Sequence, residues 1–280
     1  MSDATNTGTR IHPTAIVDAG AEIDCGAEIG PYAVVGPRVR IGAGTQIAPH
    51  VIVESDTEIG RDCRIFAGVA LGGPPQDTKY EGERTSLVIG DRNVLREYVT
   101  IHRATGEGES TRLGDDNFLM TYAHVGHNCV IGSHVTLASY VGVSGHVLIE
   151  DYVTCGGLVG IHQYSRIGTM SMVSALSGVS MDVPPYMLVN GRPARVVALN
   201  SVGLRRNGVS PEARRHLREA CKLLYLGTRD RVDAIERIKE QIPDGPEIRH
   251  LIEFAQASRE GRMGRANSPT HADDRESTEE

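Results

Sequence analysis

The sequence has few aromatic residues. Phe, Tyr and Trp make up 4% of the 280 residues, and Trp is absent. A globular core normally depends on aromatic rings for much of its buried volume, so their scarcity favours a core of small aliphatic side chains in a regular lattice. Glycine supports this interpretation, because 32 residues are Gly, a larger share than the ~7% of average proteins.

Cysteine pairs, long apolar runs and excess positive charge are also missing. The five cysteines form no C-x-x-C pair and their number is odd, which indicates reduced thiols. No segment approaches the ~18 apolar residues of a membrane span, and residues 1–10 lack the apolar core of a secretory signal. A net charge of −7 gives no support for nucleic-acid binding. We therefore expect a cytoplasmic protein with neither a membrane span nor a nucleic-acid partner.

What the sequence does contain is an aliphatic residue at every sixth position. From Ile11 to Val179 this period covers 29 positions, of which 25 hold Ile, Val or Leu and one holds Cys155. Such a period fits neither an α-helix nor a simple alternating strand. Small residues often follow the aliphatic one and allow a turn. Each hexad is therefore predicted to be a short strand and a turn, with its aliphatic side chain pointing inward.

Three hexads make one coil of a parallel β-helix. We predict this prism for residues 11–185, with about nine and a half coils and a length of roughly 45 Å. The exceptions to the period, Asp77, Glu83 and Glu107, fall in two polar segments near 72–88 and 103–112. The period returns in phase after each segment, so we expect two loops that leave the prism.

The chain after the repeat has helical signals. Residues 186–258 are predicted to form a small α-helical domain with three helices. The first starts at the N-cap Ser210 before Pro211, the second covers about 229–241, and the third follows Gly245-Pro246. Residues 1–10 and 259–280 have no period and few apolar residues, so we predict that both are disordered.

Histidines gather at one place on the predicted prism. Steps of three hexads bring His127, His146 and His162 within one position of a single column on consecutive coils, with Gln163 in that column. His124 precedes His127 by half a repeat. Aligned imidazoles are poor candidates for plain core packing, and they indicate a polar site.

The first loop is predicted to serve the same face. Leu71 and Val125 are nine hexads apart in the sequence, which corresponds to three coils. The loop that carries Gln76, Asp77 and Lys79 should then leave the histidine face three coils earlier. Loops on rigid scaffolds often carry function, so we expect this one to lie over the histidine column or to reach a neighbouring subunit.

Several motifs together resemble one family. The matching runs are Gln76–Tyr80, Thr100–Arg103, Met120–Cys129, Ser144–His146, Gly160–Gln163, Asp182–Tyr186 and Asn200–Arg206. From about Ile11 to Phe254 the chain resembles the UDP-N-acetylglucosamine O-acyltransferases that start lipid A synthesis, within the hexapeptide-repeat acyltransferase superfamily. The resemblance implies a left-handed coil, a homotrimer with active sites between subunits, and no metal or other cofactor. It also implies transfer of a 3-hydroxyacyl chain from acyl carrier protein to the 3-hydroxyl of UDP-N-acetylglucosamine.

The resemblance further implies roles for individual residues. His127 would be the general base, Asn128 would be its neighbour in the catalytic pair, and the Gly145 N–H would stabilise the oxyanion. The implied substrate-binding residues are Gln76, Asp77, Lys79, His124, His146, His162, Gln163, Asn200 and Arg206. The implied acyl-chain pocket is formed by Met172, Ala175 and Leu176.

The chain departs from the family pattern at several of these positions. Asn128 stands where the family usually has Asp, so we expect a weaker base or an acidic group supplied from elsewhere. Val202 and Asn207 replace an acidic residue and an Arg of the nucleotide-binding segment. Ala175 stands where the family has Gly and removes about a methyl group's room, which predicts a preference for acyl chains of medium length.

Two other functions fit the sequence pattern. One is N-acyl transfer to a 3-amino UDP-sugar, which differs only in the acceptor atom. The other belongs to a different class, the zinc carbonic anhydrases, which use the same prism with His ligands between subunits. His127, His146 and His162 would then bind zinc.

Overall fold

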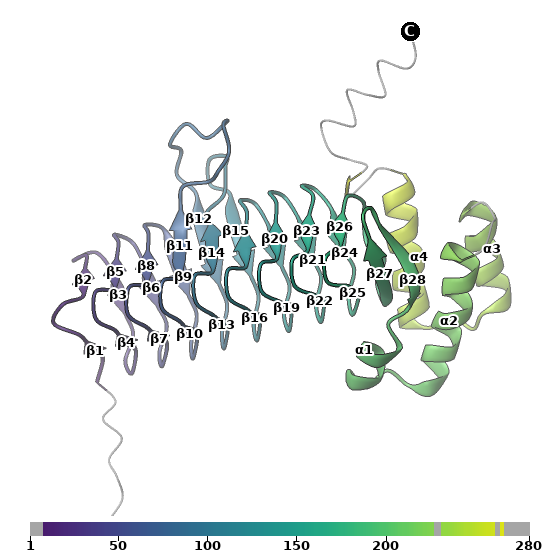
Figure 1. Cartoon of the computed structure of the whole chain (residues 1–280), viewed down its shortest axis with the longest axis horizontal. Coiled ribbons are helices and arrows are strands. Elements are labelled where there is room, and N and C mark those ends of the chain that lie inside the picture. Colours follow the sequence, from purple (N-terminus) through teal and green to yellow (C-terminus); the bar gives the residue numbers. More distant parts are fainter. Residues whose placement is uncertain (1–7, 227–230, 261–263, 266–280) are drawn as a thin grey trace, which may run out of the picture.

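The computed structural model describes residues 8–226, 231–260 and 264–265. The predicted disordered segments, 1–10 and 259–280, therefore lie mostly outside the described residues. Figure 1 shows a long prism of stacked coils, with helices gathered at its C-terminal end and two loops projecting from its middle. No helix in the described ranges is long and apolar enough to cross a membrane.

Three sheets form the faces of the prism, and successive coils pair in parallel. Sheet A contains β1 (Arg10–Ile11), β4 (Glu28–Ile29), β7 (Gln46–Ile47), β10 (Arg64–Ile65), β13 (Val94–Leu95), β16 (Phe118–Leu119), β19 (Thr136–Leu137), β22 (Thr154–Cys155) and β25 (Met172–Val173). Sheet B contains β2 (Ile16–Val17), β5 (Val34–Val35), β8 (Ile52–Val53), β11 (Ala70–Gly73), β14 (Thr100–His102), β17 (His124–Val125), β20 (Gly142–Val143), β23 (Gly160–Ile161) and β26 (Gly178–Val179). Sheet C contains β3 (Glu22–Ile23), β6 (Arg40–Ile41), β9 (Thr57–Ile59), β12 (Ser86–Ile89), β15 (Ser110–Leu113), β18 (Val130–Ile131), β21 (Leu148–Ile149) and β24 (Arg166–Ile167). The β-helix predicted from the hexads is confirmed.

The aliphatic residue of each hexad forms the core. Ile41, Leu71, Ile101 and Val125 are at most 1% exposed, and each stacks on its equivalent in the next coil. Corner residues such as His146 adopt positive φ, which is costly for a side chain with a Cβ. Backbone hydrogen bonds between coils offset this cost, as where the His146 N–H donates to the His127 carbonyl at 2.9 Å. The coils therefore stack in strict register.

The two loops span residues 74–85 and 103–109, within the predicted ranges. Residues that pair on neighbouring coils are three hexads apart in the sequence where no loop intervenes, as for Ile47 and Ile65. The separation is five hexads between Ile65 and Leu95 and four between Leu95 and Leu119. The first loop therefore adds two hexads to its coil and the second adds one.

This pairing corrects the predicted spacing between the first loop and the histidines. Leu71 pairs with Ile101, and Ile101 pairs with Val125, so β11 lies two coils from β17 and not three. The prediction counted loop residues as prism residues. Because the two insertions together are as long as one coil, the phase of the repeat could not reveal the error.

The C-terminal region begins with a hairpin, whereas the sequence analysis assigned everything from residue 186 to an α-helical domain and predicted no strand there. Strands β27 (Met187–Gly191) and β28 (Ala194–Leu199) are antiparallel, and β27 extends sheet A by pairing with β25. The hairpin forms because the open edge of β25 offers backbone partners and the alternating side chain of Val189 enters the prism core.

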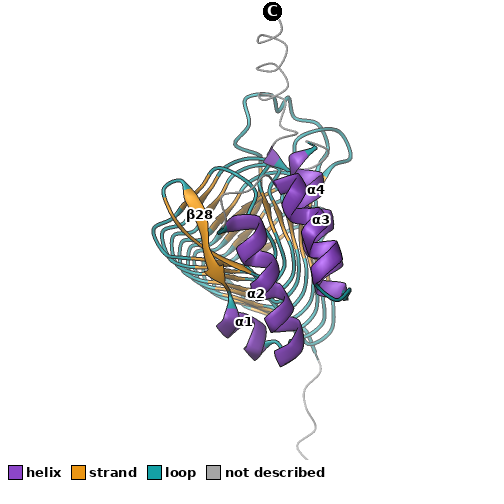
Figure 2. Cartoon of the chain, turned by 90° about the vertical axis from the view of Figure 1, so that its right-hand side faces the viewer, coloured by secondary structure: helices purple, strands orange, loops and turns teal. Residues whose placement is uncertain are grey.

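Four helices follow the hairpin: α1 (Ser201–Arg206), α2 (Pro211–Tyr225), α3 (Arg231–Gln241) and α4 (Pro246–Arg259). The Ser210 Oγ accepts a hydrogen bond from the Ala213 N–H at 3.0 Å, so the N-cap of α2 lies where the sequence indicated it. The short helix α1 was not predicted. Leu204, Leu217, Ile238 and Leu251 form a second core, and the helices lie across the end of the prism (Figure 2).

An ion pair joins helix α4 to the prism. The His250 Nε2 lies 3.2 Å from the Glu150 carboxylate, and the His250 Nδ1 lies 3.0 Å from the Tyr186 hydroxyl. The hydrogen bond to Glu150 raises the pKa of His250 above its usual value, against the opposing effect of burial; the charge of Glu253 adds to the rise and that of Arg166 opposes it. Protonated His250 therefore stabilises the docking of α4.

This ion pair predicts a pH dependence of stability. Because the pKa of His250 is raised in the folded state, its contribution should be complete below about pH 6.5 and should be lost as pH rises through the folded value. Glu150→Gln should remove about 1 kcal/mol at low pH and little at high pH. Urea unfolding at both pH values would measure this. Glu219→Gln, on the exposed face of α2, is the control, and equal losses at both pH values would contradict the assignment.

Candidate active site

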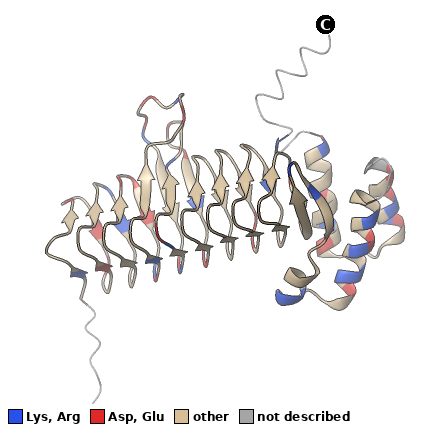
Figure 3. Ribbon diagram, viewed as in Figure 1, with Lys and Arg blue, Asp and Glu red and all other residues tan. Residues whose placement is uncertain are grey.

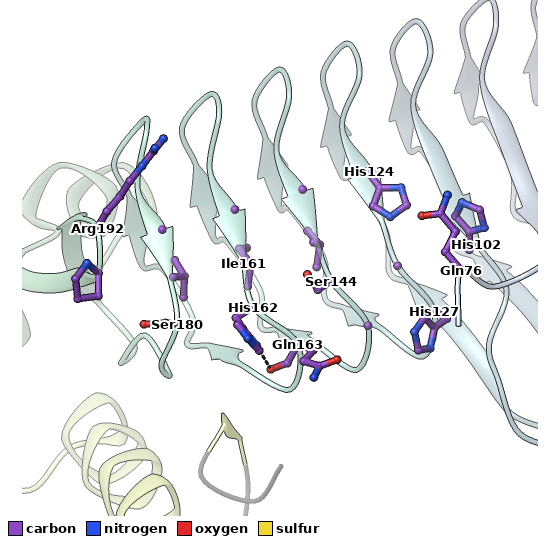
Figure 4. Close-up of a pocket in the computed structure, with 18 residues that line it drawn as sticks. Gln76, His102, His124, His127, Ser144, Ile161, His162, Gln163, Ser180 and Arg192 are labelled. Carbon is purple, nitrogen blue, oxygen red and sulfur yellow. Dashed lines mark hydrogen bonds between the residues drawn. The ribbon is translucent and has the colours of Figure 1, made fainter. Parts of the chain in front are cut away.

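A cavity of about 850 Å³ lies along sheet B, between the first loop and the hairpin turn (Figure 4). Its floor contains Gly142, Gly160 and Gly178, which are the register partners of His124 on successive coils. A Cβ at Gly142 or Gly160 would meet open space, so the missing side chains create the groove. Strands β20, β23 and β26 carry no charged residue (Figure 3). The groove therefore has an uncharged floor of glycine and aliphatic residues, and it starts at a histidine-rich end.

His127 lies at this end, at the corner after β17. Its Nδ1 is 2.9 Å from the Asn128 Oδ1, an acceptor, so Nδ1 carries the proton and Nε2 is left unprotonated. Asn128 is itself fixed, because its Oδ1 also accepts from the Thr105 N–H and its Nδ2 donates to the Thr105 carbonyl, both at 2.9 Å. The Asn128 amide thus orients the imidazole so that it can accept a proton at Nε2.

Asp77 brings a carboxylate from the first loop to the same imidazole. Its Oδ2 lies 4.0 Å from the His127 Nδ1, too far for a hydrogen bond but close enough for electrostatic attraction. A hydrogen bond from the Lys79 N–H lowers the pKa of Asp77, so the group is ionised at neutral pH. Asn128 led us to expect an acidic group from elsewhere, and Asp77 is in position to be that group.

Hydrogen bonds between the two loops fix the position of Asp77. Arg103 in the second loop donates to the Gly72 carbonyl and to the Tyr80 hydroxyl. Asp56 accepts from Arg38 and Arg84, and these bonds lower its pKa to about 2. The first loop is therefore tied at both ends.

Two further histidines are held neutral. Burial lowers the pKa of His146, and the neighbouring His127 adds to this effect. Its ring packs edge-on to that of His127 at 5.1 Å and stacks on Tyr164 at 4.6 Å. Burial also lowers the pKa of His124, whose Nδ1 is 2.8 Å from the Thr100 hydroxyl. Neutral imidazoles of this kind suit hydrogen bonds to hydroxyl groups better than ion pairs.

Gly145 lies against the His127 ring. A Cβ here would come 2.5 Å from His127 Nε2, so no larger residue fits without moving the imidazole. Within the described residues, the Gly145 N–H has no hydrogen-bond acceptor. A backbone donor and an unprotonated imidazole nitrogen thus lie at one corner, an arrangement suited to general-base attack on a carbonyl carbon.

The predicted site residues divide into two groups. Gln76, His124, His127, Gly145, His162 and Gln163 line the cavity, while Asp77, Asn128 and His146 are adjacent to His127. Lys79 is placed beside Asp77 through its N–H. The other five do not line the cavity of a single chain: Asn200, Arg206, Met172, Ala175 and Leu176.

Asn200 has a clear local role. Its side chain accepts from the Gly203 N–H at 3.1 Å as the N-cap of α1, and donates to the Met170 carbonyl at 2.8 Å. Ala175 and Leu176 lie exposed at the corner between sheets A and B, and Met172 is partly buried on β25.

Sequence reasoning missed His102 and Arg192 as cavity residues. His102 lies 2.6 Å from the Pro74 carbonyl and packs against His124. It belongs to a matching motif, but its column could be assigned only after the lengths of the two insertions were known. Arg192 lies in the turn of the hairpin, which the sequence analysis did not predict.

A metal site formed within one chain finds no support in the geometry of the described residues. In the described ranges, no three His, Cys, Asp or Glu side chains of one chain are close enough to hold a metal ion. His162 in particular is directed to the Gln163 carbonyl and to Arg265, and not toward His127.

Comparison with known families gives two matches. A family model described as UDP N-acetylglucosamine O-acyltransferase, domain 2, matches residues 182–263. A second, described as bacterial transferase hexapeptide with six repeats, matches residues 110–145. The two matches fall on the helical region with its hairpin and on the part of the prism that carries His124 and His127.

Individual proteins match over most of the chain. The acyl-(acyl-carrier-protein)–UDP-N-acetylglucosamine O-acyltransferase of Thermodesulfovibrio yellowstonii is 47% identical over 252 residues, covering 90% of this chain and 98% of the relative. The enzyme of the same name from Halorhodospira halophila is 47% identical over 254 residues, with the same coverage.

Solved structures agree with the sequence matches. LpxA from Acinetobacter baumannii superposes with a TM-score of 0.85 at 42% identity, covering 89% of this chain and 97% of that one. The UDP-N-acetylglucosamine acyltransferase of Francisella novicida also gives a TM-score of 0.85, at 36% identity, covering 89% and 92%. The left-handed winding that the sequence resemblance implied is confirmed by this likeness. On this sequence identity and shared fold, the chain belongs to the family of acyl-(acyl-carrier-protein)–UDP-N-acetylglucosamine O-acyltransferases.

Proposed function

We propose that this protein transfers a 3-hydroxyacyl chain from acyl carrier protein to the 3-hydroxyl of UDP-N-acetylglucosamine, the first step of lipid A synthesis. The observation that carries the proposal is the corner formed by His127 and Gly145 at the head of the glycine-floored groove. The names of the relatives describe an O-acyltransferase with acyl-acyl-carrier-protein and UDP-N-acetylglucosamine as substrates. We place the reaction in the cytoplasm and in a homotrimer.

The geometry supports a general-base mechanism. The His127 Nε2 takes the proton of the sugar 3-hydroxyl as the oxygen attacks the thioester carbonyl carbon. The carbonyl oxygen becomes an oxyanion, which accepts a hydrogen bond from the Gly145 N–H. The intermediate then breaks its C–S bond, and the leaving thiolate recovers the proton from the His127 imidazolium. The product is the O-acylated sugar nucleotide, and the carrier leaves as its free thiol.

An Asp next to His127 would both orient the imidazole and supply a negative charge. In this chain we assign these two functions to Asn128 and Asp77, respectively. Asn128 holds the tautomer through its Oδ1 at 2.9 Å. Asp77, 4.0 Å from Nδ1, supplies the negative charge that favours the imidazolium formed during the reaction. We propose that this division retains general-base catalysis with Asn at position 128.

The remaining side chains at the head of the cavity suit a sugar nucleotide. We propose that His124, His146 and Gln163 hydrogen-bond sugar hydroxyls, and that Gln76, Lys79 and His162 bind other polar groups of the substrates. Asn200 and Arg206 do not line the single-chain cavity. In a trimer we assign them to the nucleotide end of a site shared with a neighbouring subunit.

The acceptor atom is open to one alternative. Asn128 supplies no charge, and an amine is a stronger nucleophile than an alcohol and needs less help from a base. A 3-amino UDP-sugar is therefore a second candidate acceptor, and the same assay can compare the two.

The first prediction concerns His127. Purified protein with a 3-hydroxyacyl carrier protein and UDP-N-acetylglucosamine should turn over, and His127→Ala should lower kcat by about 10²- to 10⁴-fold because the general base is lost. His50→Ala is the matched control, since His50 also stacks at a prism corner but lies outside the cavity. Turnover with only the amino sugar would reassign the acceptor, and full activity of His127→Ala would refute the assignment of the base.

The second prediction separates charge from orientation. Asp77→Asn should lower kcat roughly 5- to 10-fold, as expected for a unit charge about 4 Å away in a water-like medium. Adding Asn128→Asp to this variant should restore part of the loss, because a carboxylate then adjoins the imidazolium. Steady-state kinetics of the three variants would measure the coupling. A double variant no better than Asp77→Asn would mean that Asp77 acts only by shaping its loop.

The third prediction concerns acyl length. The exposed corner at Ala175 and Leu176 is the proposed end of the acyl site, so the wild type should favour a medium-length 3-hydroxyacyl donor. Ala175→Gly should shift the ratio of kcat/KM toward longer donors, by roughly fourfold for each extra buried methylene. Highest wild-type turnover with the longest donor would contradict the assignment. Ala138→Gly, two coils away from the proposed end of the acyl site, controls for a general effect of glycine.

A further inference from the structure

A short stretch after α4 returns to the prism beside the cavity. The Arg265 N–H donates to the Asp182 Oδ1 at 2.9 Å. Gly264 has a φ of +78°, and a Cβ at this position would overlap the Asp182 carboxylate. This approach therefore requires glycine, which marks Gly264-Arg265 as a specific docking point.

The docking point is built from buried polar groups. Asp182 pairs with Arg166 at 3.4 Å, and the two side chains are 8% and 7% exposed. The Arg166 guanidinium lies 3.9 Å above the Phe254 ring and donates to the Phe254 carbonyl and to the Ser258 hydroxyl. The Ser258 hydroxyl in turn donates to Asp182. The network holds the end of α4 and the Arg265 backbone against the last coil.

From this anchor the Arg265 side chain reaches His162. Its Nη2 lies 3.5 Å from the His162 Nε2, and the His162 Nδ1 lies 3.3 Å from the Gln163 carbonyl. An arginine can only donate, so Nε2 must accept and the imidazole proton is on Nδ1. His162 and Gln163 both line the cavity. Arg265 is therefore one contact away from the groove and fixes the tautomer of a residue in it.

Two nitrogens of this guanidinium lack partners. Nε and Nη1 of Arg265 are buried, and neither has an acceptor among the described residues. No ion pair of Arg265 occurs in the described ranges either. A buried charged donor without an acceptor is costly. Nε and Nη1 lie on opposite sides of the guanidinium, and each forms a two-donor edge with Nη2, whose second hydrogen is not directed to His162. Either edge suits two oxygens of one phosphate.

We propose that Arg265 is a substrate-binding residue that receives a phosphate group at the His162 side of the cavity. This inference rests on the proposed function, because both proposed substrates carry phosphate. The nucleotide sugar has a diphosphate, and the carrier's pantetheine arm has a phosphodiester. Residue 265 lies beyond the segment that the O-acyltransferase family model matches, so the resemblance assigned it no role.

The test compares Arg265→Ala and Arg265→Lys with wild type, varying each substrate in turn. We expect Arg265→Ala to raise one KM by about 10- to 100-fold, as for loss of a hydrogen bond to a charged group, with kcat changed much less. Arg265→Lys should recover part of the loss as a point charge. Gly264→Ala should reproduce the KM defect by displacing the segment. Arg259→Ala, an exposed residue at the end of α4, is the charge-matched control.

The pattern of KM changes identifies the phosphate. A nucleotide contact raises the KM for UDP-N-acetylglucosamine and weakens inhibition by UDP. A carrier contact removes the advantage of acyl-phosphopantetheine over acyl-pantetheine as the donor. Values within twofold of wild type for both substrates, with only the melting temperature changed, would overturn the proposal and leave Arg265 a structural residue.

A wild type without turnover would instead refute the proposed function. The Arg265 proposal is then decided by calorimetric binding of UDP and of phosphopantetheine to wild type and to Arg265→Ala. Loss of binding of either ligand in the variant supports the phosphate contact, and equal binding, or none to either protein, overturns it.

Discussion

The constraint on which this structure depends is the register between coils. Every coil must place its aliphatic residues above those of the coil before, and at corners such as His146, Tyr152 and Tyr164 a backbone hydrogen bond to the preceding coil holds the costly left-handed residue that turns the chain. Insertions are tolerated only if the register resumes after them. The two loops meet this condition because they add two hexads and one hexad, whole repeats in both cases. The site is therefore made of insertions and of outward-facing residues that the lattice leaves free.

The corner around His127 combines residues of the coils with a residue of an inserted loop. His127, Gly145 and His146 are fixed by the coils, whereas Asp77 comes from a loop held by Arg103 and by the Asp56 carboxylate. In the proposed mechanism, this division explains how Asn can stand next to the base. The coil supplies orientation through a neutral amide, and the loop supplies charge without altering the backbone of the prism.

Much of this arrangement could be predicted from the sequence, and the failures have physical causes. The hexads predicted the prism because burial repeats at a fixed interval, and steps of three hexads brought His127 and His146 together because no insertion separates them. The loop spacing was wrong because two insertions added up to one coil. The hairpin at 187–199 was missed because its first strand forms by pairing with β25, a partner that local sequence does not reveal. The N-cap formed by Asn200 was not predicted, because the family resemblance implied a substrate-binding role for this residue.

The glycine floor of the groove has a consequence for how such enzymes diversify. Gly142, Gly160 and Gly178 follow one another along the prism at the coil spacing of roughly 4.8 Å. Distance along the groove is thus set in the sequence at intervals of three hexads, and a side chain placed at one of these glycines would extend into the groove at a chosen depth without disturbing the buried aliphatic residue next to it. Ligand length and fold stability are consequently encoded by different residues, which leaves selection free to change the first while the second stays constant.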